Sequence, residues 1–264
     1  MIKIENTVVP SAAWWEGVIR GARNPMNSWD KSDSWIYSDG EFELGDNDRK
    51  LLTGLAEAGT DHRKYMRMIP VLVDITAPIF WWKEFDTYKI GTTRNSCSTM
   101  HKIHSNPFTI DDFSHEGCDT VDYAREELDH LIDICERLRN DFNETKDKKY
   151  WRALIEILPE NYNMRSTVTL NYENLRNMYH ARKNHKLIEW HVLCDWIENL
   201  PYSELITGEC NEEKIYSFEF CGHHGEVYVP ANASETEINA AIFKEMSRIV
   251  DVDVKYEWTV EKKN

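Results

Sequence analysis

Apolar residues recur at helical spacing in several segments of the chain. From Val121 to Phe142 they follow alternating steps of four and three residues, so they form one continuous stripe along a helix. Cys135 stands within this stripe, which favours a packing role for its thiol. The same spacing, with start and stop signals at its ends, predicts further helices over residues 46–58, 79–89, 150–158, 172–182 and 187–198.

Two shorter segments have the alternation that is typical of β-strands. Residues 69–75 are rich in β-branched side chains and end at Ala77-Pro78. Residues 165–170 alternate Ser and Thr with apolar positions. Because long helices separate these segments, the pattern predicts a small sheet with helices around it.

The end of the chain has a different pattern. It predicts, in order, a hairpin over residues 214–229 with its turn at 221–225, a helix that a capping box at 234–237 opens and that runs to about 250, and a strand over 252–260. Acidic residues outnumber basic residues in this part, so it does not suit an anion. We interpret residues 1–205 as the main domain and residues 206–264 as an acidic β-β-α-β appendage.

Charge and composition narrow the class of protein. The 264 residues carry a formal net charge of −15, which disfavours broad contact with a nucleic-acid backbone but allows a local pocket for a mononucleotide. No apolar run approaches the roughly 20 residues that span a bilayer. The start of the chain lacks the pattern of a signal peptide, and the six cysteines form no CxxC pair. We therefore expect a cytoplasmic protein that binds neither nucleic acid nor membrane.

Two polar segments stand out against this background. Residues 77–100 leave an apolar helix and enter a turn rich in Ser, Thr and Asn. Later, Leu158-Pro159 is followed by Asn171, Asn177, Arg182 and Glu189-Trp190. The spacing alone is also typical of ordinary helix ends, and capping of a helix is a plain interpretation of Asn171.

In order and spacing, these segments resemble the flavin-dependent thymidylate synthases. That family typically has an Ala-Pro-Ile-Phe-like helix start, a later Leu-Pro, and then an Asn, an Asn and an Arg at steps of six and five. Residues 77–80, Leu158-Pro159, and Asn171, Asn177 and Arg182 follow this pattern. The resemblance covers roughly residues 1–205 and leaves out the appendage.

The chain departs from the family in the signature that follows the helix start. Thr87, Tyr88 and Lys89 stand where the family has Arg-His-Arg, and Lys83-Glu84 stands where it has Arg-Gln. Further along, the replacements are Thr92 and Cys97 for two serines, Arg94-Asn95 for Asn-Glu, and Thr99 for a final Arg. Lysine at position 89 keeps a charge but loses the bidentate fork of arginine.

The resemblance implies an α+β fold, in which a small, mostly antiparallel sheet is flanked by helices, and a homotetramer. It implies C5 methylation of a pyrimidine deoxynucleotide such as dUMP, with FAD, NADPH and methylenetetrahydrofolate as cofactors. By the same resemblance, Lys89, Tyr88, Asn171 and Asn177 contact the flavin, whereas Glu84, Thr92, Arg94, Thr99 and Arg182 contact the substrate. Arg182 would bond a pyrimidine carbonyl on which charge develops.

Three alternatives stay open at this stage. The altered signature also fits a non-catalytic descendant that binds a nucleotide or acts in assembly. Cys97 is a candidate nucleophile for pyrimidine C6, because Lys89 and Arg94 are near in sequence, although a serine-sized thiol in a turn is more often inert. The pairs His101/His104 and His115/Cys118, and His223-His224, have intervals that resemble zinc ligands, but surface loop histidines are the plainer interpretation, and we expect no metal site.

Overall fold

The computed structural model describes residues 2–208, 213–220, 223–230, 238–239, 241–243, 246 and 259–262. The chain divides into two compact units, Met1–Thr207 and Gly208–Asn264. Among the described residues, none of the helices combines the length and the apolar character needed to cross a membrane.

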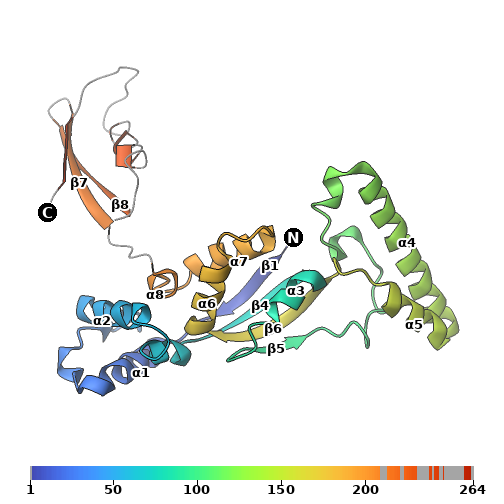
Figure 1. Ribbon diagram of the computed structural model, residues 1–264, viewed down its shortest axis with the longest axis horizontal. Coiled ribbons are helices and arrows are strands. Elements are labelled where there is room, and N and C mark those ends of the chain that lie inside the picture. The colour runs from blue at the N-terminus through green and yellow to red at the C-terminus, as the bar shows by residue number, and fades with distance from the viewer. Residues whose placement is uncertain are drawn as a thin grey trace. The chain divides into compact units, whose positions relative to one another are not determined.

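An antiparallel sheet of four strands forms the centre of the first unit (Figure 1). Its strands lie in the order β1 (Lys3–Val8), β4 (Pro70–Pro78), β6 (Asn163–Asn171) and β5 (Thr93–Ser96). The two predicted strands, at 69–75 and 165–170, are confirmed as the paired central strands β4 and β6, in register with Val73 opposite Val168. Alternate residues of β4 are buried, so one face of the sheet contributes to the core.

Helices account for most of the rest of this unit. They are α1 (Ala12–Arg23), α2 (Asp46–Glu57), α3 (Ile79–Phe85), α4 (Asp122–Thr145), α5 (Lys148–Ile157), α6 (Tyr172–Arg182), α7 (Ile188–Glu198) and the single turn α8 (Glu204–Thr207). A short ribbon of β2 (Trp35–Ile36) and β3 (Phe42–Glu43) joins α1 to α2. The pattern of sheet and flanking helices is the α+β architecture that the sequence predicts.

Helix α3 is shorter than the sequence predicts. It ends at Phe85 instead of continuing to residue 89. The Asp86 N–H donates to the carbonyls of Trp82 and Glu84, and the Thr87 hydroxyl donates to the Glu84 carbonyl at 2.7 Å. A threonine hydroxyl competes in this way for the carbonyl of a last helical turn, so the helix stops and the chain turns toward β5.

The helices α4 and α5 pack against each other as a hairpin of their own (Figure 1). Leu128, Ile132 and Cys135 are the buried residues of α4, which confirms the predicted stripe. Cys135 packs against Leu154 of α5 and Ile103. Burial raises the pKa of the Cys135 thiol to about 11, so this cysteine is a small apolar residue at neutral pH.

The second unit contains a sheet in the order β8-β7-β9, made of β7 (Glu213–Phe220), β8 (His223–Pro230) and β9 (Thr259–Lys262). The predicted hairpin is confirmed, with Phe220 opposite His223. Gly225 belongs to strand β8 and not to the turn: a Cβ there would stand 2.4 Å from the ring of Phe218. The capping box at 234–237 and residues 252–258 of the predicted strand lie outside the described residues.

Candidate functional site

Arg182, the last residue of α6, lies at the centre of a polar cluster between α3, α6 and α7. Its Nη1 donates to Glu84 Oε2 at 3.0 Å, and its Nε donates to the Tyr88 hydroxyl at 2.9 Å. Its guanidinium carbon lies 4.7 Å from the centre of the Trp190 ring. We call Arg182, Glu84, Tyr88, His185 and Trp190 the Arg182 cluster.

Aromatic packing fixes the walls of this cluster. Trp81, Trp82 and Phe85 are buried on one side of α3, which directs Glu84 away from that core. Trp190 of α7 is fully buried and packs on Trp81, with 4.9 Å between the ring centres. The Arg182 guanidinium therefore rests on a fully buried and closely packed indole, and cation–π attraction adds to the hydrogen bonds.

Glu84 compensates the charge of Arg182. The same carboxylate oxygen, Oε2, accepts from Arg182 and from Trp190 Nε1 at 2.8 Å, and it lies 3.6 Å from His185 Nε2. The side chains of Arg182 and Glu84 are 19% and 35% exposed, so both still reach solvent. Within the described part of the chain, Arg182 Nη2 and Glu84 Oε1 have no hydrogen-bond partner. The cluster thus offers a ligand one free donor, Arg182 Nη2, and one free acceptor, Glu84 Oε1. The positive charge of Arg182 is largely balanced by the negative charge of Glu84.

Arg94 of β5 is committed to a contact of its own. Its Nη2 donates to Asp86 at 3.0 Å, and its guanidinium carbon lies 4.5 Å from the centre of the Trp82 ring. Its Nη1 is buried and finds no partner among the described residues. The positive charge that Arg94 could offer to a ligand is therefore largely offset by Asp86.

Asn171 has the role of a helix cap. Its side-chain oxygen accepts from the Asn174 N–H at 3.0 Å, and the Asn174 side chain accepts in return from the Asn171 N–H at 3.2 Å. This capping box opens α6, and the Asn174 amide also donates to the Ile90 carbonyl at 2.6 Å. The capping interpretation of Asn171 is confirmed, and Asn174 is the residue that sequence reasoning missed.

Asn177 and Lys89 are open to ligands. Asn177 is exposed in the middle of α6, and its side-chain oxygen accepts from Arg63 Nη2 at 3.4 Å. Its side-chain NH₂ group donates to none of the described residues. Lys89 is exposed and makes no ion pair within the described residues. Thr92 binds back to the Tyr88 carbonyl at 2.8 Å, which leaves its hydroxyl as an acceptor only.

Cys97 and Thr99 lie outside these contacts. Cys97 is an exposed free thiol just after β5, and its N–H donates to the Arg165 carbonyl at 2.8 Å. Arg165 and Asn171 are six residues apart on β6, so this point lies about 20 Å along the strand from the cap of α6. Thr99 is half-buried in the loop that follows. None of the described contacts joins either residue to the Arg182 cluster.

Two of the histidines considered as zinc ligands make contacts with protein side chains. His115 Nδ1 lies 2.7 Å from Asp119 Oδ2, and the His104 ring packs on Phe142. In the described part of the chain, no group of three or more His, Cys, Asp or Glu side chains has the arrangement of a metal site.

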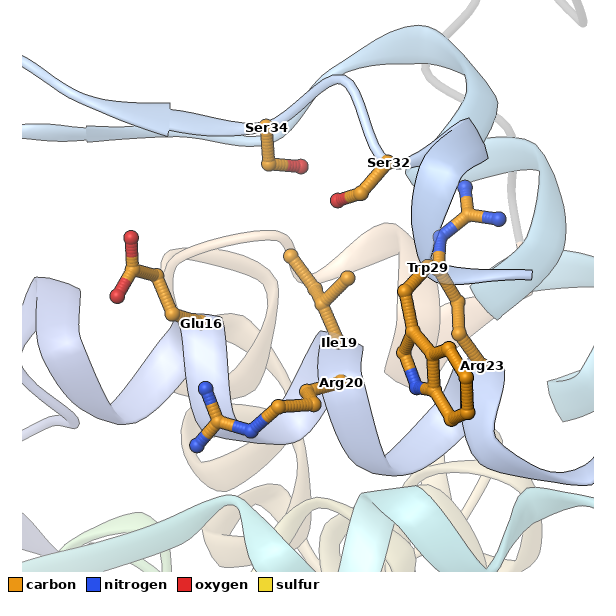
Figure 2. A pocket seen from close by; sticks show the side chains of 7 residues that line it. All are labelled: Glu16, Ile19, Arg20, Arg23, Trp29, Ser32 and Ser34. Carbon is orange, nitrogen blue, oxygen red and sulfur yellow. The ribbon is translucent and has the colours of Figure 1, made fainter. Parts of the chain in front are cut away.

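A cavity of about 270 Å³ between α1 and the loop before β2 contains none of the predicted residues (Figure 2). Behind it, Arg23 and Asp48 form a buried ion pair of 2.5 Å. The Asp48 carboxylate also accepts from the hydroxyls of Ser32 and Ser34, each at 2.7 Å. Burial raises the pKa of Asp48, but the hydrogen bonds from Ser34, Ser32 and Arg23 outweigh it and hold that pKa below its ordinary value.

No protein-family model and no curated protein matches the chain. Solved structures that share its fold include two of the flavin-dependent thymidylate synthase ThyX from Helicobacter pylori with FAD and dUMP. One is 15% identical and covers 78% of this chain, the other is 17% identical and covers 79%, and each aligns over 98% of its own length with a TM-score of 0.56. The chain therefore has a ThyX-like α+β fold.

Proposed function

We propose that the protein is an enzyme of the flavin-dependent thymidylate synthase type, which methylates C5 of a pyrimidine deoxynucleotide such as dUMP. The observation that carries the proposal is the Arg182 cluster, where a guanidinium with a free donor is held between carboxylate, phenol and indole. The shared fold supports it, because the two similar structures hold FAD and dUMP.

The cluster is suited to a pyrimidine ring. Arg182 Nη2 would donate to a ring carbonyl, and Glu84 Oε1 would accept from the neighbouring ring N–H. When C5 acts as a nucleophile, negative charge develops on that carbonyl oxygen, and a fixed guanidinium stabilises it without reorganisation. Trp190 holds the guanidinium in place, so the ring meets a donor that is already oriented.

Lys89 and Asn177 fit the phosphates and ring carbonyls of FAD, because both are exposed and keep free donors. Asn171, predicted as a flavin contact, is occupied by the cap of α6, and Arg94, predicted as a substrate contact, is occupied by Asp86. We assign Lys89 and Asn177 to flavin binding. A bound reduced flavin supplies hydride, with NADPH as its reductant and methylenetetrahydrofolate as the source of carbon. A homotetramer is part of the proposal.

The first experiment is a flavin titration of the purified protein, followed by dUMP. The proposal expects uptake of FAD with a change in its absorbance, and NADPH- and methylenetetrahydrofolate-dependent formation of dTMP. Arg182→Gln should lower product formation by about 10²-fold or more while FAD uptake persists. Arg165→Gln is the matched control, because Arg165 is an exposed arginine whose ion-pair partner is Asp74 on the sheet. Failure of the wild-type protein to form product with any supplied flavin contradicts the proposal.

A second candidate is a nucleotide-binding protein without flavin chemistry. The specific observation in its favour is that Arg94 and Arg182 are both paired with carboxylates and Asn171 is committed to its cap. Such a protein would be colourless after addition of FAD and would still be stabilised thermally by dUMP. The flavin titration therefore separates the two candidates.

A further inference from the structure

A cavity of about 630 Å³ lies at the start of α7. Its walls come from the start of α3, the segment 114–118, Asn161, and the segment 186–189 that leads into α7. This volume is in the range of small-molecule sites. The cavity contains no residue of the Arg182 cluster.

A mostly buried carboxylate, without a partner among the described residues, lines this cavity. Glu189 is only 7% exposed, yet no described residue donates a hydrogen bond to it or pairs with its charge. An acid in the first turn of a helix is favoured by the helix dipole, but that effect does not require burial. The Glu189 oxygens are not among the described side-chain atoms that are fully buried without a partner, so they remain accessible. A mostly buried carboxylate with accessible oxygens at a cavity wall suits a ligand that brings a cationic or hydrogen-bond donor.

The walls of the cavity are held in place by backbone contacts. The Ser114 N–H donates to the Asn161 backbone carbonyl at 2.8 Å, and the Asn161 side-chain Nδ2 donates back to the Ser114 backbone carbonyl at 2.9 Å. The Phe80 N–H donates to the Glu160 carbonyl at 3.0 Å, which ties α3 to the same segment. The cavity is therefore preformed, and a ligand would not have to order these segments.

The lining favours a planar cation. A carboxylate accepts two parallel N–H bonds from a guanidinium or amidinium, and this pairing is among the strongest hydrogen-bonded contacts in proteins. Phe80 provides an aromatic face, and Leu187 and Ile188 provide apolar walls for a flat group and its alkyl chain. Lys186 is the one cation among the lining residues, and it would pair with an anionic group at the far end of a ligand.

We propose that this cavity binds a small molecule with a guanidinium group, through a bidentate contact to Glu189. The guanidinium could belong to a free amino acid such as arginine or to an amine such as agmatine, which has no carboxylate. Lys186 distinguishes these sources, since only the amino acid offers it a counter-charge. This inference does not depend on the proposed function.

The test is calorimetric titration of the full chain with arginine and agmatine, without flavin or pyrimidine. We expect at least one of them to bind and citrulline, which replaces the guanidinium by a neutral urea, not to bind. Glu189→Gln should weaken binding by about tenfold or more, as expected for a charge-assisted pair. Lys186→Gln should weaken arginine alone if the amino acid is the ligand, and neither compound if the amine is.

Two controls keep the result interpretable. Glu16→Gln removes an exposed carboxylate on α1, outside this cavity, and should leave binding unchanged. Ile188→Trp fills the cavity from a side chain that is 60% exposed, so it should block binding without affecting folding, even if Glu189→Gln is unstable. The proposal is overturned if neither compound binds the wild-type protein. It is also overturned if Glu189→Gln and Ile188→Trp both bind as tightly as the wild type does.

Discussion

Two of the arginine–carboxylate pairs in the first unit, Arg23–Asp48 and Arg182–Glu84, have the same chemistry but differ in burial and in how many of their bonding groups are used. Arg23 and Asp48 are 4% and 0% exposed, and each additional bonding group on them is used by the loop 28–34. Arg182 and Glu84 are partly exposed and keep a donor and an acceptor free. The first pair organises a loop, whereas the second is available to a ligand. Saturation of the hydrogen-bonding capacity, and not the presence of an ion pair, separates a structural pair from a site.

The largest effect should come from breaking the buried pair. Asp48→Ala leaves Arg23 buried without its counter-charge and releases the hydroxyls of Ser32 and Ser34. Removal of one partner of a buried pair typically costs about 3–5 kcal/mol. Urea unfolding, followed by tryptophan fluorescence, measures this loss. Glu16→Ala is the control in the same region, because Glu16 is exposed, and it should change stability by less than about 0.5 kcal/mol.

Arg182→Gln should have the opposite profile to Asp48→Ala: a small loss of stability and a large loss of activity. Since Arg182 is partly exposed, its loss should cost about 1 kcal/mol of unfolding free energy or less. Product formation should fall by about 10²-fold or more, as for removal of a donor that stabilises a developing oxyanion. Unfolding and single-turnover assays on the same preparation separate the two effects. A loss of stability comparable to that of Asp48→Ala would mean that the Arg182 cluster is structural.

The stability that the buried pair contributes should also depend on pH. The pKa of Asp48 is lowered in the folded state relative to its ordinary value of 3.8, so its contribution to stability is complete above that value and is lost as the pH falls through the folded pKa. In Asp48→Asn, that contribution is absent at all pH values. The difference in unfolding free energy between the wild type and Asp48→Asn should therefore be constant near neutral pH and shrink below about pH 4. A difference that grows on acidification would contradict the assignment.

The sequence predicted the elements better than the contacts. Periodicity located α4 and α6 because their apolar residues face a core, and alternation located β4 and β6 for the same reason. It placed the end of α3 four residues too late, because Thr87 ends the helix through a hydroxyl bond and not through a change in hydrophobicity.

The partners of the site residues could not be read from spacing. Nothing in the sequence indicates that Asp86 offsets Arg94 or that Glu84 offsets Arg182, since these pairs depend on how α3 and α6 pack. The cap at Asn171 was predictable, because Asn at a strand-to-helix junction is a local signal. The complementary Asn174 was missed because the usual capping partner at that position is Glu or Gln.

The smallest effect should come from Cys97, which belongs to neither pair. Its thiol is exposed, and none of the described contacts connects it with the Arg182 cluster. Cys97→Ser should therefore change product formation by about twofold or less, because a hydroxyl replaces a thiol that takes no part in the reaction. If the thiol attacks pyrimidine C6 instead, the serine variant should lose several orders of magnitude in rate, as other enzymes do without their nucleophile. Such a loss would move the chemistry from Arg182 to the end of β5, and the comparison of the two pairs would no longer locate the site.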